Sequence, residues 1–70
     1  MRPGIYRIVV EGELGPRYTA AFDGMRLELC DGDTALVGMV EDQAELQGVL
    51  DSVTALGLSL VSVTPINESP

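Results

Sequence analysis

The sequence predicts an α+β fold, with four β-strands and two α-helices in the order strand, helix, strand, strand, helix, strand. Segments rich in β-branched residues recur along the 70 residues and alternate with segments whose apolar residues have helical spacing. A tight Asp-Gly turn joins the two strands that follow each other directly. The length suits one small domain.

The first predicted strand is the segment GIYRIVVEGE, which begins at Gly4. Valine, isoleucine and tyrosine favour extended backbone because their side chains pack well on a pleated surface. Successive side chains point to opposite faces of a sheet. The two predicted faces are Tyr6, Ile8 and Val10 on one side and Ile5, Arg7 and Val9 on the other.

The segment LGPRYTAAFDG is predicted to form a first helix of two turns. Pro16 suits the first helical position because an amide hydrogen there would have no helical partner, and Gly24 suits the C-terminal cap. A short apolar stripe is formed by Leu14, Tyr18, Ala21 and Phe22.

The next two strands are predicted to form a hairpin. MRLELC alternates strictly, with Met25, Leu27 and Leu29 pointing inwards. In the following DGD turn, Gly32 can take a positive φ angle. The return strand, TALVGMV, has no polar face beyond its first residue.

A second helix and a last strand complete the predicted order. Asp42 suits the N-cap, Glu45 completes a capping box, and Gly57 suits a left-handed C-terminal cap. The last strand, LSLVSVT, is predicted to end before Pro65, because proline lacks an amide hydrogen for pairing. The apolar stripe of the helix is Leu46, Val49, Leu50, Val53 and Leu56.

Together these elements predict a ferredoxin-like βαββαβ sandwich. Such a fold has a four-stranded antiparallel sheet with two helices on one face, and here the first helix is short. The first and third strands are central, flanked by the last and the second. Residues 1–65 are predicted to form the single domain, and residues 66–70 a flexible C-terminal tail.

The sheet face that the helices leave open is predicted to be apolar in its middle. An antiparallel sheet with one wet face should carry polar residues there, yet three predicted strands are apolar on both faces. A large exposed apolar patch usually marks an interface. The alternative is that these valines only reflect strand propensity. The predicted interface residues are Ile5, Arg7, Val9, Val37, Met39, Val61 and Val63.

Composition narrows the classes of partner. Eleven carboxylates against four arginines give a net charge of −7, which disfavours binding to nucleic acid and to anionic membranes. The segment MRPGIYRIVV lacks the long apolar region of a signal peptide, so a cytoplasmic location is predicted.

Cys30 is the one cysteine and histidine is absent, which excludes an internal disulfide and disfavours an ordinary zinc site. Association is then the expected source of extra stability for a chain this small.

Catalytic side chains are scarce in this sequence. Without histidine or lysine, acid–base chemistry would fall to carboxylates, tyrosines or Cys30, and no Ser/His/Asp or Cys/His constellation can form. Cys30 is interpreted as a small half-buried strand residue. The DGD turn near Glu28 lacks the further oxygen ligands of a calcium loop. We therefore expect no catalytic residue, no metal site and no cofactor.

The loop EGELGP after the first strand is a candidate ligand site. In ferredoxin-like regulatory domains this turn often binds a small ligand, near the free amides at a helix N-terminus. Gly12 and Gly15 allow close backbone approach, whereas Glu11 and Glu13 would favour a cationic or zwitterionic ligand. The alternative is a flexible loop that only leads into the helix.

The segments FDGM and LVGMVEDQAELQGVLDSVTALGLSLVSV resemble a group of short uncharacterised proteins common in actinobacteria. The most specific part of the resemblance is DQAELQGVLDSVTALGLSLVSV. The resemblance implies a bacterial cytoplasmic protein with the ferredoxin-like fold, and it brings no activity.

These observations predict a non-enzymatic interaction or regulatory module that forms a homodimer or higher homo-oligomer through the open sheet face, or binds another protein there. The alternative is an ACT-like sensor that binds a small ligand in the loop or across a dimer seam. The candidate ligand-loop residues are Glu11, Gly12, Glu13 and Gly15. A third interpretation is a small dimeric ferredoxin-like enzyme, in which Tyr6, Tyr18 or Glu28 would have to act.

Overall fold

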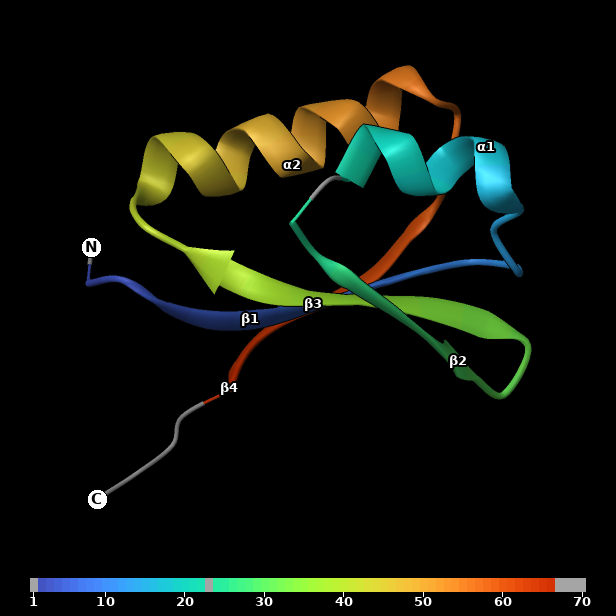
Figure 1. Ribbon diagram of the computed structural model, residues 1–70, viewed down its shortest axis with the longest axis horizontal. Helices are drawn as coiled ribbons and strands as arrows, with labels where there is room; N and C mark the ends of the chain where they lie inside the picture. Colours follow the sequence, from blue (N-terminus) through green and yellow to red (C-terminus); the bar gives the residue numbers. More distant parts are fainter. Residues whose placement is uncertain (1, 23, 67–70) are drawn as a thin grey trace.

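A computed structural model describes residues 2–22 and 24–66. The strands are β1 (Gly4–Val10), β2 (Arg26–Cys30), β3 (Asp33–Val40) and β4 (Leu60–Ile66). The helical elements are α1 (Pro16–Thr19), the 3-10 helix η1 (Ala20–Phe22) and α2 (Gln43–Ala55). The strands form one antiparallel sheet, and all three helical elements lie on the same side of it (Figure 1).

The sheet has the strand order β2-β3-β1-β4, with β1 and β3 in the centre. Ile8 of β1 lies opposite Leu36 of β3 and Val63 of β4, so these three side chains share one face. The β2–β3 hairpin closes through Asp31 and Gly32, whose φ angles are 51° and 87°. Two consecutive positive φ angles indicate a type I′ turn, which matches the twist of the paired strands. The predicted turn at Gly32 is confirmed.

The first helix is shorter than predicted. A single α-helical turn, α1, gives way to the three residues of η1, and Gly24, with a φ angle of 88°, turns the chain into β2. Gly15 at the N-cap provides no side-chain hydrogen bond, so little compensates the cost of starting this helix. In the described chain α2 is then the one helix longer than a single α-helical turn. The predicted ferredoxin-like βαββαβ sandwich with two helices is therefore wrong.

The short first helix leaves part of the sheet uncovered on the helix side. Leu29 pairs with Thr34 in β3, whose other neighbour across the sheet is the buried Val10. Leu29 therefore points to the helix side as predicted, but 69% of its side chain is exposed because neither α1 nor η1 extends over it.

Both ends of α2 follow from local sequence. The carboxylate of Asp42 accepts a hydrogen bond from the Glu45 amide at 2.8 Å, which confirms the predicted N-cap. At the other end, the amides of Gly57 and Leu58 donate to the carbonyls of Thr54 and Val53. This pair of bonds, with a φ angle of 75° at Gly57, is the Schellman motif. With 13 residues in α2, the described residues contain no helix long and apolar enough to cross a membrane.

The core lies between α2 and the central strands. Its buried members come from β1, η1, β3 and α2: Ile8, Val10, Phe22, Leu36 and Val53. Predicted stripe residues of α2, such as Leu46 and Val49, pack against this cluster, whereas Leu56 is 37% exposed. A cluster this small means that each member carries a large share of the stability.

Strand β4 differs from the prediction in two ways. Pairing does not stop before Pro65, because Pro65 and Ile66 lie opposite Tyr6 and Ile5 of β1. Pro65 is tolerated because β4 is an edge strand. The predicted tail therefore loses Ile66 to the sheet, and residues 67–70 lie outside the described residues.

The second difference is a β-bulge. Val9 pairs with Ser62 and Val10 pairs with Leu60, so Val61 is the extra residue of β4. The bulge places both Leu60 and Val63 on the helix side, although strict alternation would separate them. Val63 accordingly packs against the core.

Gly38 is required by the path of the chain into β2. A Cβ atom at this position would lie 3.0 Å from Cγ and 3.3 Å from Cα of Met25. We expect Gly38→Ala to lower the free energy of unfolding by about 1–3 kcal/mol, because the Met25 backbone would have to move. Urea denaturation followed by circular dichroism measures this.

The matched control is Gly48→Ala in the middle of α2, where a Cβ atom would meet nothing within 4 Å. This variant should be about 0.5–1 kcal/mol more stable than the wild type, because glycine is the poorer helix former. Two changes of the same sign would contradict the described approach of Met25 to β3.

Candidate functional site

The sheet face opposite the helices is a continuous surface formed by all four strands. Arg7 lies at its centre, opposite Val37 of β3 and Thr64 of β4, and Val37 in turn lies opposite Arg26. We call this surface the open face. Its residues are Ile5, Arg7, Val9, Arg26, Glu28, Cys30, Asp33, Ala35, Val37, Met39, Ser62, Thr64 and Ile66.

Five of the seven predicted interface residues lie on the open face: Ile5, Arg7, Val9, Val37 and Met39. The other two do not. Val63 faces the helices, and Val61 is the exposed extra residue of the bulge. Their positions on β4 are taken by Ser62, Thr64 and Ile66. The part that these residues play in an interface stays a prediction.

The charged groups of the open face are balanced. Arg26 forms an ion pair with Glu28, with 2.9 Å between Nε and Oε2. The side chain of Arg26 is 72% exposed and that of Glu28 is 42% exposed, so this pair contributes little to stability. The Nε atom of Arg7, by contrast, is buried and makes no hydrogen bond within the described chain. A buried donor of this kind is uncommon, because its lost contact with water is not replaced.

Hydrogen bonds to β3 and to Ser59 hold the candidate ligand loop in place. The amide of Gly12 donates to Asp33 Oδ1 at 3.0 Å, and the amide of Leu14 donates to Thr34 Oγ1 at 3.1 Å. The Glu11 amide donates to the Ser59 carbonyl at 2.8 Å. Three amides of the loop are therefore engaged within the protein, and the role of the loop as a ligand site stays a prediction. A four-residue α1 also provides no long helix dipole to attract a ligand.

Tyr6 and Glu28, two of the side chains considered for catalysis, lie on opposite faces of the sheet. Tyr6 lies opposite Gly38, on the helix side, and Glu28 lies on the open face in its pair with Arg26. Cys30 is a half-buried free cysteine that lies opposite Asp33 at the hairpin. No group of three or more cysteine, aspartate or glutamate side chains within residues 2–22 and 24–66 is placed to hold a metal ion.

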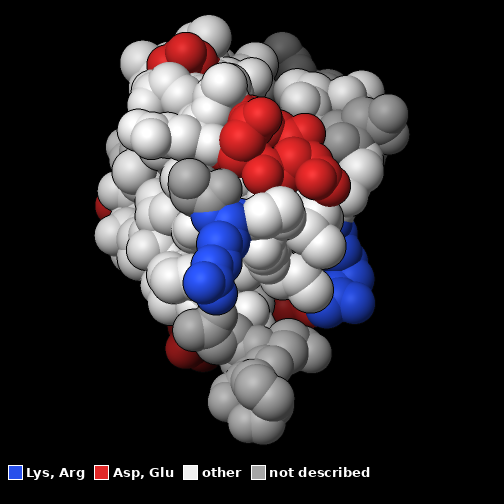
Figure 2. All heavy atoms as spheres, turned by 90° about the vertical axis from the view of Figure 1, so that its left-hand side faces the viewer, with Lys and Arg blue, Asp and Glu red and all other residues white. Residues whose placement is uncertain are grey.

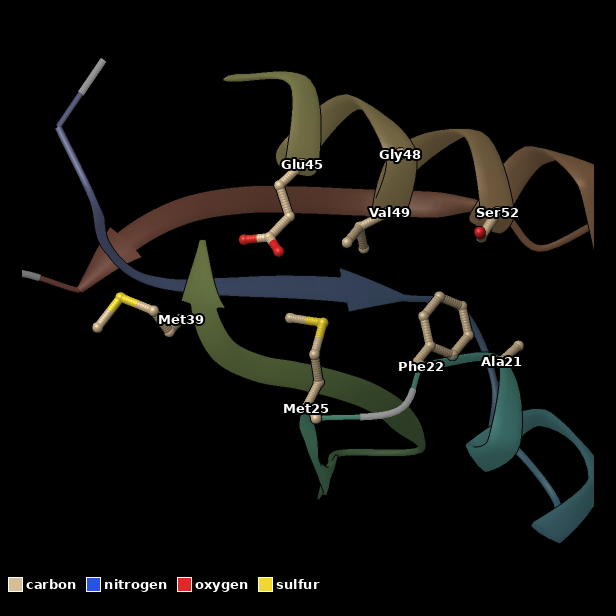
Figure 3. A pocket seen from close by; sticks show the side chains of 9 residues that line it. Ala21, Phe22, Met25, Met39, Glu45, Gly48, Val49 and Ser52 are labelled. Atoms are coloured by element: carbon tan, nitrogen blue, oxygen red, sulfur yellow. The ribbon is translucent and has the colours of Figure 1, made fainter. Parts of the chain in front are cut away.

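A cavity of about 390 Å³ lies on the helix side, between α2 and the segment that leads into β2. It forms where β3 extends beyond its partner, since β2 pairs with β3 only as far as Val37. The α2 residues at the cavity include Glu45, Gly48 and Val49, and Phe22 and Met25 line it from the other side (Figure 3). Its size is in the range of small-molecule sites.

A family model described as "Domain of unknown function (DUF8691)" matches residues 5–64. The chain belongs to this family. The match runs from β1 into β4, so the open face and the cavity are both built almost wholly from residues of the DUF8691 domain. No curated protein and no solved structure matched the chain. The resemblance to actinobacterial proteins stays a prediction.

Two features of this DUF8691 chain were missed by sequence reasoning. The cavity was not predicted, although a glycine inside a helical pattern, Gly48, was a signal for it. The hydroxyl of Thr34, which holds the loop through Gly12 and Leu14, had no signal in the sequence. Both depend on contacts between residues far apart in the chain.

Proposed function

We propose that this protein is a non-enzymatic interaction module that forms a symmetric homodimer through the open face. The observation that carries the proposal is the composition of that face. Half-buried apolar side chains, among them Ile5, Val9 and Val37, surround an arginine whose Nε has no partner. The surface lies on the side of the sheet that α1, η1 and α2 leave bare (Figure 1).

The distribution of charge favours a second copy as the occupant. The open face carries Arg7 and Arg26 against Glu28 and Asp33, so its charges balance, whereas the chain as a whole carries a charge of −7. Two copies that meet through any acidic surface would repel each other. Contact between two open faces brings less repulsion than contact through an acidic surface, because the charges of the open face balance.

The unpartnered Nε of Arg7 also favours face-to-face association. In a two-fold dimer the same surface meets itself, so an acceptor on one copy can reach the Arg7 of the other. Glu28 is such an acceptor, because its exposed ion pair with Arg26 occupies only one carboxylate oxygen in the described structure. A buried arginine paired in this way would add specificity to an apolar contact.

The small core supports the same proposal. A chain of 70 residues without an internal disulfide gains only about 3–5 kcal/mol from one hydrophobic core. A standard interface buries about 800 Å² of each partner. The described molecule exposes 4620 Å², so such an interface would cover about a sixth of its surface. Burial of the open face would supply the second apolar layer that the sheet lacks.

Light scattering on a sizing column tests the proposal. The wild type should elute with twice the chain mass of 7.4 kDa, and Val37→Arg should elute with the mass of one chain. Position 37 lies between Arg7 and Arg26, so a third guanidinium there would repel both of them, and an unpaired charge buried in an interface costs about 3 kcal/mol, which weakens association about a hundredfold. Met39→Glu, at a side chain that is 54% exposed, is a second disrupting variant with little risk to folding.

The matched control is Val61→Glu, because Val61 is 53% exposed but does not lie on the open face. This variant should remain dimeric. A wild type that is monomeric at millimolar concentration would refute the proposal, and so would a dimer that Val61→Glu disrupts while Val37→Arg and Met39→Glu leave it intact.

A further inference from the structure

The cavity beside α2 combines an apolar wall with one carboxylate. Phe22 and Met25 provide apolar surface on one side, and Val49 provides it on the other. Glu45 stands at the same cavity, and in Figure 3 its carboxylate points from α2 towards the side chain of Met25. A pocket with apolar walls and a few convergent polar groups is the usual form of a small-molecule site.

The position of the Glu45 carboxylate is fixed by the start of the helix. Its Oε1 accepts a hydrogen bond from the Glu41 amide at 2.6 Å, while its own amide donates to Asp42. The carboxylate is thus held by one oxygen. Among residues 2–22 and 24–66 the structure shows no hydrogen bond to the other oxygen, Oε2, which can accept one from a ligand. A group oriented before binding loses little entropy when a ligand arrives.

Gly48 is the least expected residue of the cavity wall. Glycine inside a helix costs about 1 kcal/mol relative to alanine. Packing does not require it here, because a Cβ atom at this position would meet nothing within 4 Å. The empty space next to Gly48 is part of the cavity. The folded chain therefore bears a local cost whose visible effect is to keep the cavity open.

The negative charge near the cavity favours a cationic ligand. Glu41, Asp42 and Glu45 are all exposed at the start of α2, and Figure 2 shows a group of acidic side chains at this end of the molecule. A helix N-terminus alone would attract an anion through a partial charge of about +0.5. Three carboxylates outweigh that charge, and Asp42 already engages one of the helix amides.

We propose that this cavity binds a small organic cation: a primary ammonium group at Glu45, with an apolar body against Met25, Phe22 and Val49. The ammonium would donate to the carboxylate oxygen that the helix cap leaves unused. The apolar body would occupy the space that Gly48 leaves open. Met39 of the open face also lines the cavity, but none of the groups proposed to contact the ligand lies on that face, so the proposal does not depend on dimer formation.

The test is a titration of the ¹⁵N-labelled full chain with n-hexylammonium, hexanoate and hexanol, followed by amide chemical shifts. Hexylammonium should produce saturable shifts at Gly48, Val49 and Met25, and should bind more tightly than hexanol. Hexanoate should bind most weakly of the three. Shifts spread over the surface, or equal affinities for the ammonium and carboxylate probes, would overturn the proposal.

Two variants test separately the contribution of the Glu45 carboxylate and that of the space next to Gly48. Glu45→Gln keeps a side chain that can cap the helix, and should weaken hexylammonium binding about three- to fivefold while leaving hexanol unchanged. Gly48→Leu should weaken binding of all three probes with α2 intact, because leucine is a strong helix former whose side chain would occupy the part of the cavity next to α2. The matched control is Asp51→Asn, which removes one charge from α2 at a residue that does not line the cavity. If Asp51→Asn weakened binding as much as Glu45→Gln, the proposed contact would be wrong.

Discussion

Replacing Leu36 by alanine is expected to remove most of the stability of the protein at 25 °C. Leu36 lies in the central strand β3, opposite Ile8 of β1 and Leu27 of β2, and none of its surface is exposed. It belongs to the cluster that joins β1, η1, β3 and α2. Truncation of a buried leucine costs about 2–5 kcal/mol, because the lost burial is accompanied by a cavity that neighbours fill only in part.

The expected effect follows from comparing this cost with the total free energy of unfolding of the domain. A domain of this size has about 3–5 kcal/mol of stability from its core, so the loss is of the same size as the total. Urea denaturation at one fixed protein concentration measures it, since association adds a concentration-dependent term to the stability. Leu29→Ala is the matched control, because Leu29 is 69% exposed and should lose less than about 0.5 kcal/mol. Equal losses in the two variants would mean that the core is not centred on β3.

The strands and α2 could be predicted because their signals are local. The alternation of side chains along β1 correctly predicts that Ile8 and Val10 face the core. The positive φ angles of Asp31 and Gly32 are those that an Asp-Gly hairpin turn requires. Asp42 caps α2 through a hydrogen bond to a residue three positions away. Each of these features is decided by residues that are close together in the chain.

The errors come from features that depend on distant contacts. Pro16 correctly predicted where a helix begins, but the extent of α1 depends on what it packs against, and one turn is all that forms. Val63 was assigned to the wrong face because a single bulge at Val61 reverses the alternation of β4. The bulge has no sequence signal, since valine is as suitable for a regular strand as for this one.

The second large effect is expected at Thr34, which is buried with 2% of its surface exposed. Its hydroxyl donates to the Gly12 carbonyl at 2.8 Å and accepts from the Leu14 amide at 3.1 Å. Thr34→Val keeps the shape and strand propensity of the side chain but removes both bonds. The two backbone groups are then left without partners at a part-buried site, which costs about 2–3 kcal/mol in total.

The Thr34→Val substitution should open the loop without unfolding the rest of the domain. Gly12 would still be held through its amide by Asp33, so the loop should open chiefly around Leu14. Hydrogen exchange at the Leu14 amide should become fast, while the amides of Ile8 and Leu36 in the central strands keep their ranking as the most protected. Thr54→Val provides the matched control, because Thr54 is exposed and its hydroxyl only adds a bond to the Leu50 carbonyl within α2. If Thr34→Val were as stable as this control and kept Leu14 protected, the loop would be held by contacts other than the Thr34 hydroxyl.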